Sequence, residues 1–314
     1  MLPLLADQAR LAKEQLPTEH YAWVNAAAGE GLTSGEASWA RYRFRPHVLR
    51  DVTTVDTSLT LLGTALRTPV LVGPTAFQGR SHPGGETATW EAAQSVGSLM
   101  VWPIRADQPV QGPCWWQAYV LRDRSRTLDA ALHARDAGAT AIVLTGDTPY
   151  LGSARRPALG DLDQSPAASL DDIAWLATET GLPVLVKGVL RADDALACLA
   201  AGAAGVIVSN HGGRQLDRAL PTAIALPEVV EAVAGAAPVL VDGGLRSGSD
   251  VLTALALGAT AVLLGKPVVW ALASNGAAGV AACLSAVTED LRHVMGLAGS
   301  ASLADVDRSL VVSG

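Results

Sequence analysis

The 314-residue chain has few cysteines, few charged residues and no excess of positive charge. Its three cysteines, Cys114, Cys198 and Cys283, are too few and too scattered for a disulfide framework or a zinc site. Such thiols suit a reducing compartment, so we expect a cytoplasmic protein and no metal. Charged residues make up 17% and the net charge is −7, which argues against a general nucleic-acid or anionic-membrane surface.

Long apolar runs are also missing, because Asp, Arg, Gly or Pro interrupts each run before membrane-spanning length. The first residues mix charges into an apolar pattern, so neither a targeting signal nor a membrane segment is predicted. Hydrophobic residues nevertheless make up 49%, which excludes disorder and provides a packed core.

Short apolar runs rich in β-branched residues recur along the chain and read as strands buried on both faces. They are Pro69–Gly73, Ser98–Trp102, Trp115–Tyr119, Ala141–Thr145, Pro183–Lys187, Gly205–Ser209, Pro238–Asp242 and Ala261–Gly265. Ala-rich helical patterns ending in Gly separate most of them. Eight alternations predict an α/β fold, a (β/α)₈ TIM barrel. A doubly wound open sheet is the alternative, but G-x-G-x-x-G does not follow the first strand.

Two parts fall outside this alternation. Residues 1–60 read as an N-terminal helical segment packed on the barrel, with a short strand near Ser58–Leu62, and residues 61–314 form the barrel with a C-terminal helix. The connection from strand four to strand five runs from Gly146 to Leu182 and begins with a Pro/Gly/Arg-rich piece. A loop of this length over the catalytic face predicts a lid.

Polar residues recur where the predicted strands end, which is the catalytic face of a barrel. They are Thr75, Gln117, Tyr119, Thr145, Asp147, Lys187, Ser209, His211, Arg214, Asp242, Arg246 and Lys266. The last two loops, DGGLRSG and LGKP, combine glycines with a cation, and loops after strands seven and eight commonly bind phosphate. A phosphate site together with inward-pointing amide, hydroxyl and Lys groups suggests a phosphorylated cofactor. Flavin mononucleotide (FMN) fits, because such groups can bind the edge of a flavin ring.

The segment SNHGGRQLD places His211 directly after a buried strand and Arg214 three residues later. Histidine can act as a general base near neutral pH, and the planar guanidinium of Arg matches a carboxylate. A base, a carboxylate clamp and a flavin together predict oxidation of a 2-hydroxy acid. The α-hydrogen leaves as a hydride or as a proton, and the same residues serve both routes.

These motifs, with LPVLVKG, PVLVDGGLRSGSDVLTALALGA, LLGKPVVWALA, GPTAFQG, WWQAY and LTGDTP, resemble those of the FMN-dependent 2-hydroxy acid oxidases and dehydrogenases, such as glycolate oxidase, lactate oxidase and mandelate dehydrogenase. The resemblance extends from about Leu16 to the end of the chain. It implies His211 as base, Asp147 as its carboxylate partner, and Arg214 and Tyr119 as substrate contacts. It also implies a homo-oligomer, usually a tetramer.

The resemblance further assigns a set of FMN contacts. They are Pro74, Thr75, Ala76, Gln117, Thr145, Lys187 and Ser209 at the ring, Asp242 at the ribityl chain, and Gly244, Arg246, Gly265 and Lys266 at the phosphate. The substrate side departs from the family pattern. Trp23 stands where the family carries a tyrosine, with Tyr21 two residues earlier, and Ala154 replaces a second arginine, followed by Arg155 and Arg156.

Several functional alternatives remain open at this point. A remodelled substrate side suggests an aryl, mandelate-like acid, with Trp23, Phe77, Trp102, Trp115 and Trp116 as candidate pocket residues. Tyr21 and Arg155 are further candidates for substrate binding. A diverted member of the family would use FMN for oxidative decarboxylation or another two-electron oxidation. A non-catalytic flavin-binding protein is a third hypothesis. The presence of His211, Asp147 and Arg214 together argues against it.

Overall fold

The computed structural model describes residues 1–29, 35–150 and 163–314. Within these residues, eight short parallel strands form one sheet in the order β4-β11-β10-β9-β8-β7-β6-β5. Their bounds are β4 Val70–Val72, β5 Val101–Pro103, β6 Cys114–Ala118, β7 Ala139–Thr145, β8 Val184–Val189, β9 Gly205–Val208, β10 Val239–Asp242 and β11 Ala261–Leu264. The backbone N–H of Val72 donates to Leu99 O at 2.9 Å, which joins the two edges. The predicted closed barrel is therefore confirmed, and the open sheet is wrong.

Side chains alternate between the inside of this barrel and its helical coat. Leu71, Val143, Leu185 and Ile207 belong to one buried cluster inside the barrel. Their neighbours Val70 and Val72 belong to a second cluster, shared with the helices. Strands buried on both faces need apolar residues at successive positions, which explains the continuous runs in the sequence.

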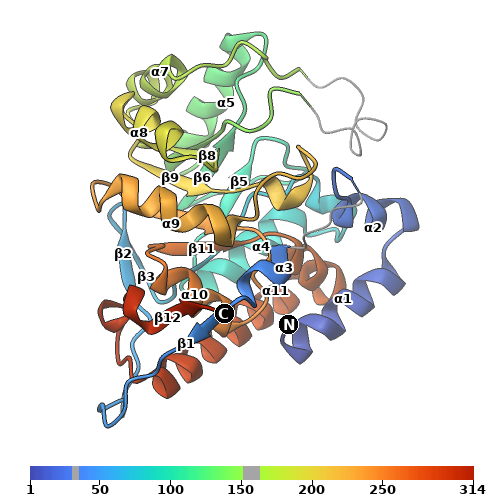
Figure 1. Cartoon of the computed structure of the whole chain (residues 1–314). Helices are drawn as coiled ribbons and strands as arrows, with labels where there is room; N and C mark the ends of the chain where they lie inside the picture. Colours follow the sequence, from blue (N-terminus) through green and yellow to red (C-terminus); the bar gives the residue numbers. More distant parts are fainter. Residues whose placement is uncertain (30–34, 151–162) are drawn as a thin grey trace.

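Helices cover the outside of the barrel (Figure 1). They are α1 Pro3–Gln15, α2 Thr18–Asn25, α3 Gly35–Trp39, α4 Gly85–Ser95, α5 Arg124–Asp136, α7 Asp171–Thr180, α8 Ala192–Ala200, α9 Thr222–Val233, α10 Gly248–Ala256 and α11 Lys266–Ala298. Two residues past the ends of α5 and α10, Gly138 and Gly258 have φ of 110° and 100°. Glycine adopts this conformation without steric cost, so it ends these helices as the sequence predicts.

Two small antiparallel sheets lie outside the barrel. The hairpin of β2 (Leu59–Leu61) and β3 (Thr64–Leu66) leads into the amino end of β4, and Leu61 and Leu66 pack into the interior cluster. The hairpin thus covers the end of the barrel at which the strands begin. In the second sheet, β1 (Tyr42–Phe44) pairs with β12 (Val311–Ser313). Figure 1 shows α1 lying along α11, which places the predicted N-terminal helical segment against the helical coat.

The sequence predicts that no apolar run reaches membrane-spanning length, and helix α11 departs from this expectation. By length and composition it is the one helix of the described residues that could cross a membrane, and more than half of its apolar window is buried in the protein. It is kinked in its first half, because Asn275 and Gly276 leave helical geometry and Gly276 has φ 55°. The predicted lid over residues 151–162 lies outside the described residues.

Candidate active site

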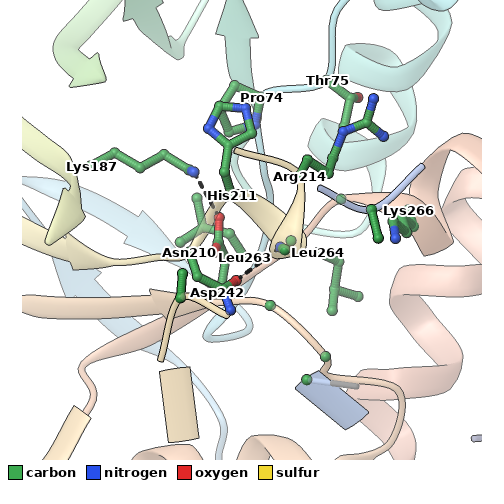
Figure 2. A pocket seen from close by; sticks show the side chains of 18 of the residues that line it. Pro74, Thr75, Lys187, Asn210, His211, Arg214, Asp242, Leu263, Leu264 and Lys266 are labelled. Carbon is green, nitrogen blue, oxygen red and sulfur yellow. Dashed lines mark hydrogen bonds and ion pairs between the residues drawn. The ribbon is translucent and has the colours of Figure 1, made fainter. Parts of the chain in front are cut away.

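A cavity of about 750 Å³ opens at the ends of the strands where their carboxyl termini meet. Most of the predicted cofactor and substrate residues line it: Trp23, Pro74, Thr75, Ala76, Gln117, Tyr119, Thr145, Lys187, His211, Arg214, Asp242, Gly244, Arg246, Gly265 and Lys266. In Figure 2, Lys187 reaches in from one side, Arg214 and Lys266 lie on the other, and His211 stands between them. This volume is within the usual range for a cofactor or ligand site.

Three of the predicted site residues that the structure describes are not in the cavity wall. Asp147 and Ser209 lie behind it and contact residues that line it. Tyr21 packs beside α11 in a separate apolar cluster, so the structure does not support it as a substrate contact. Arg155 lies outside the described residues.

His211 is held by a buried carboxylate. Its Nδ1 lies 3.1 Å from Asp147 Oδ1 and 3.3 Å from Oδ2, and Thr148 donates a hydrogen bond of 3.0 Å to the same Oδ1. Burial alone would raise the pKa of Asp147, but His211, Lys187 and Thr148 outweigh it and lower that pKa to about 2. Because Asp147 is ionised, Nδ1 of His211 must carry the proton and donate it to the carboxylate.

The backbone around His211 is strained in a way that fixes the side chain. His211 has φ 59°, a left-handed conformation that non-glycine residues seldom adopt. Its N–H donates to Ser209 Oγ at 3.1 Å, and the N–H of Gly213 donates to Asn210 Oδ1 at 3.3 Å. Side chains of the same loop thus hold the turn that leads from β9 into the cavity, which is typical of strained functional sites.

Lys187 lies in the second half of β8 and is almost fully buried. Its Nζ is 3.0 Å from Asp242 Oδ2 and donates to Ser209 Oγ at 2.7 Å. Burial would lower the pKa of Lys187, but Asp242 and Asp147 outweigh it and raise the pKa. Lys187 therefore keeps a permanent positive charge inside the cavity.

Amide and hydroxyl groups lie beside this lysine on β7 and β6 and, across the barrel, after β4. Gln117 Nε2 donates to Thr145 Oγ1 at 3.1 Å, which links the ends of β6 and β7. Thr75 Oγ1 accepts a hydrogen bond of 2.9 Å from Gln78. These donors and acceptors are of the type that binds the polar edge of a flavin ring.

The last two strands of the barrel, β10 and β11, are followed by a cationic cradle formed by Arg246 and Lys266. Arg246 Nη2 pairs with Glu36 Oε1 at 3.0 Å, and the buried Arg246 Nε has no hydrogen-bond partner within the described part of the chain. Burial, with Arg214 and Arg246 nearby, lowers the pKa of Lys266 to about 8. Lys266 also begins α11, where backbone N–H groups favour an anion. Closely placed cations with one acidic partner are the arrangement that a phosphate requires.

Close backbone approach shapes this cradle. Gly244 has φ 84°, and a Cβ there would lie 2.2 Å from the carbonyl carbon of Gly35. The indole N–H of Trp39 donates to Gly243 O at 2.8 Å and fixes α3 against the same loop. The orphaned Arg246 nitrogen and this side-chain-free surface fit a phosphorylated cofactor.

The substrate side contains fewer aromatic residues than expected. Trp23 lines the cavity, stacks under the Arg214 guanidinium at 5.0 Å, and contacts Phe77 with 6.0 Å between ring centroids. Trp115 instead fills the inside of the barrel, while Trp102 and Trp116 face the helices. The expectation that these three line an aryl pocket is wrong. Successive side chains of a pleated strand point to opposite faces, so these residues pack inside the barrel or against the helices rather than at the cavity.

Three contributing residues were not predicted. Glu36 pairs with Arg246, Thr148 supports Asp147, and Arg105 lines the cavity with its Cζ 5.4 Å from the centre of the Tyr119 ring. Thr148 could have been found from its place beside Asp147. Arg105 was missed because the predicted strand stopped at Trp102, whereas β5 extends to Pro103 and directs the following turn into the cavity.

The sequence and the structure both have close counterparts among known proteins. Residues 12–159 and 158–313 match the FMN-dependent dehydrogenase family. The chain belongs to the FMN-dependent dehydrogenase family. Glycolate oxidase of Spinacia oleracea is 39% identical, with 96% of this chain and 94% of the oxidase aligned. A peroxisomal (S)-2-hydroxy-acid oxidase of Oryza sativa subsp. japonica is also 39% identical, over 98% and 95%.

Solved structures agree with this family assignment. Mandelate oxidase with (S)-4-hydroxymandelic acid is 37% identical, with a TM-score of 0.92 and 99% of each chain covered. A mandelate oxidase variant with a C4a-OH-FMN adduct is 39% identical, with a TM-score of 0.92 over 98% of this chain and 99% of that one. FMN is thus the cofactor of this family member, and its cavity has the charges and hydrogen-bonding groups to hold it.

The depressed pKa of Lys266 predicts that FMN binding depends on pH. Without FMN, Lys266 loses its proton near pH 8, whereas a neighbouring phosphate dianion favours the protonated form. Binding therefore takes up a proton above pH 8, and we expect the affinity for FMN to be about tenfold lower at pH 9 than at pH 7. Fluorescence titration of the apoprotein measures this slope.

Lys266→Arg provides the control for this titration, because a guanidinium stays protonated throughout this range. The variant is expected to bind FMN with little change between pH 7 and pH 9. An equal slope in the variant and the wild type would assign the pH dependence to another group.

Proposed function

We propose that this protein oxidises a 2-hydroxy acid to the 2-oxo acid with bound FMN. His211 lines the cavity with Arg214 and Tyr119, and Asp147 lies behind it. The observation that carries the proposal is the contact of 3.1 Å between His211 Nδ1 and the ionised Asp147. A histidine base beside a carboxylate clamp is the chemistry that a hydroxy acid needs. Curated relatives at 39% identity are glycolate and 2-hydroxy-acid oxidases.

His211 acts as the general base. Because its Nδ1–H is donated to Asp147, Nε2 is the basic nitrogen and takes the proton from the substrate hydroxyl. The imidazolium that results is stabilised by the Asp147 carboxylate, as in other His–Asp pairs. FMN supplies the two-electron acceptor for the oxidation.

Arg214 and Tyr119 hold the substrate carboxylate. Arg214 Nη1 donates to Val24 O at 2.5 Å and its guanidinium lies on Trp23, so α2 fixes the direction of the fork. A planar guanidinium offers several further N–H groups to a carboxylate. Lys187, paired with Asp242, contributes positive charge on the side of the cavity away from Arg214.

An anaerobic spectrum tests the proposal. The purified protein should be yellow, and the colour should bleach when the correct 2-hydroxy acid is added without oxygen. Glycolate, lactate and mandelate form the first panel, with aryl acids included because structural relatives are mandelate oxidases. A yellow protein that no 2-hydroxy acid bleaches would contradict the proposal and favour the diverted or non-catalytic alternatives.

We also propose a cytoplasmic homo-oligomer. Three buried, unpaired cysteines, Cys114, Cys198 and Cys283, support a reducing compartment. The oligomer is proposed from the resemblance to the family, and light scattering of the purified protein checks it.

A further inference from the structure

A buried amide, the side chain of Gln78, lies directly behind one part of the cavity wall. Gln78 begins the short 3₁₀-helix Gln78–Arg80 after β4 and does not line the cavity itself. Its Nε2 donates to the backbone O of Thr75 at 3.1 Å and to Thr75 Oγ1 at 2.9 Å. Thr75 is among the labelled residues that line the cavity in Figure 2, so Gln78 contacts the wall from its far side.

The hydrogen bonds of Gln78 leave one orientation for its amide. A backbone carbonyl can only accept, so the group that faces Thr75 O must be the NH₂ end of the side chain. At the other end, Thr89 Oγ1 donates to Gln78 Oε1 at 2.5 Å. A flipped amide would set its oxygen against the Thr75 carbonyl, so the nitrogen stays on the side of Thr75.

A buried carboxylate holds the backbone of the same turn. Glu86 Oε1, on α4, accepts the N–H of Gln78 at 3.0 Å. Glu86 Oε2 accepts the N–H groups of Asp107 and Gln108, in the loop after β5, at 3.1 Å and 3.0 Å. Glu86 and Thr89 both belong to α4 and are both buried. This helix therefore fixes the backbone and the side chain of Gln78 together.

These contacts decide how the Thr75 hydroxyl can bond. An amide NH₂ group is a donor only, so Thr75 Oγ1 accepts from Gln78 and cannot give its own proton in return. Within residues 1–29, 35–150 and 163–314, no acceptor pairs with this proton. The Thr75 methyl group lies towards Gly265, where an added Cβ would be 3.7 Å from Thr75 Cγ2. The hydroxyl proton is therefore left for a group bound in the cavity.

We propose that Gln78 is a positioning residue for the cofactor, which makes Thr75 a hydrogen-bond donor to the flavin ring of FMN. Gln78 does not contact FMN in this arrangement and acts through Thr75 alone. A hydroxyl group that is already oriented loses less conformational freedom when the cofactor binds. The role concerns the cofactor and does not depend on which acid the protein oxidises.

Two variants of similar shape test the inference. Thr75→Val removes the hydroxyl group, and Gln78→Met removes the amide but keeps a side chain of similar length. Each variant should weaken FMN binding by about three- to tenfold, because one hydrogen bond between neutral groups is lost. Each should also shift the visible absorption bands of bound FMN, since hydrogen bonds to the ring tune its electronic structure. Fluorescence titration of the apoproteins and absorbance spectra of the loaded proteins measure the two effects.

The double variant separates positioning from a general loss of packing. Once Thr75→Val has removed the hydroxyl group, Gln78→Met has little left to change, so the double variant should bind FMN within about twofold of Thr75→Val. Losses that multiply in the double variant would show that the two side chains act independently and would overturn the inference. A Gln78→Met protein with the affinity and spectrum of the wild type would overturn it as well.

Gln94→Met is the matched control. Gln94 also lies on α4, and its Nε2 donates to a backbone carbonyl, Pro113 O, at 2.9 Å, but neither residue lines the cavity. This variant should bind FMN as the wild type does. Riboflavin has the same ring without the phosphate, so Thr75→Val and Gln78→Met should weaken its binding by the same factors. A loss for FMN but not for riboflavin would place the acceptor at the phosphate and contradict the inference.

Discussion

Replacing His211 with asparagine should slow the anaerobic bleaching of the flavin by its substrate by about three orders of magnitude. The variant removes the nitrogen that accepts the hydroxyl proton, and positioned general bases contribute about 10²- to 10⁴-fold. Asparagine suits this position because it tolerates the φ of 59° better than most residues. Stopped-flow absorbance measures the rate.

The control for this variant is His293→Asn, because His293 is exposed on α11 and far from the cavity wall. It should bleach at the wild-type rate. The His211 variant should keep its yellow colour, since His211 is not part of the cationic cradle. A variant that binds FMN and still bleaches within about tenfold of the wild type would remove His211 from the role of base.

Lys187→Met should lower the free energy of unfolding of the apoprotein by about 3 to 5 kcal/mol. The substitution leaves Asp242 with a largely buried charge and no cation, and breaking a buried ion pair from one side has this cost. Urea denaturation, followed by circular dichroism, measures the loss.

A double variant identifies the cause of this loss. Adding Asp242→Asn to Lys187→Met removes the uncompensated charge and should restore much of the stability. Lys13→Met, in the exposed face of α1, should change stability by less than about 0.5 kcal/mol. If the double variant is less stable than Lys187→Met, the ion pair is not the source of the effect.

The barrel strands could be predicted because burial on both faces leaves a plain signal in the sequence. The run Ala141–Thr145 lies inside the observed strand Ala139–Thr145, and the others agree within a few residues. The short strand pairs outside the barrel left no such pattern in the sequence. The strand predicted near Ser58–Leu62 is β2, but its partner Thr64–Leu66 is only three residues long, and β1 finds β12 because the barrel brings the two segments together.

The site could be predicted where polar residues follow strands directly, as His211 and Lys187 do. It could not be predicted where the result depends on the direction of a side chain. Trp115 and Trp116 are adjacent in sequence, yet one enters the barrel and the other faces the helices. Glu36 reaches Arg246 only because α3 packs on the loop after β10, and spacing in the sequence does not reveal that contact.

The contact between Gly35 and Gly244 has a consequence for the order of events during synthesis. The backbone surface that these two glycines form can exist only after the roughly two hundred residues between them have been made. The barrel strands between them must also have paired. Contacts so distant in sequence form late, since the loop between them must first be ordered. The nascent chain should therefore remain colourless until the loop after β10 has been made and has folded against α3.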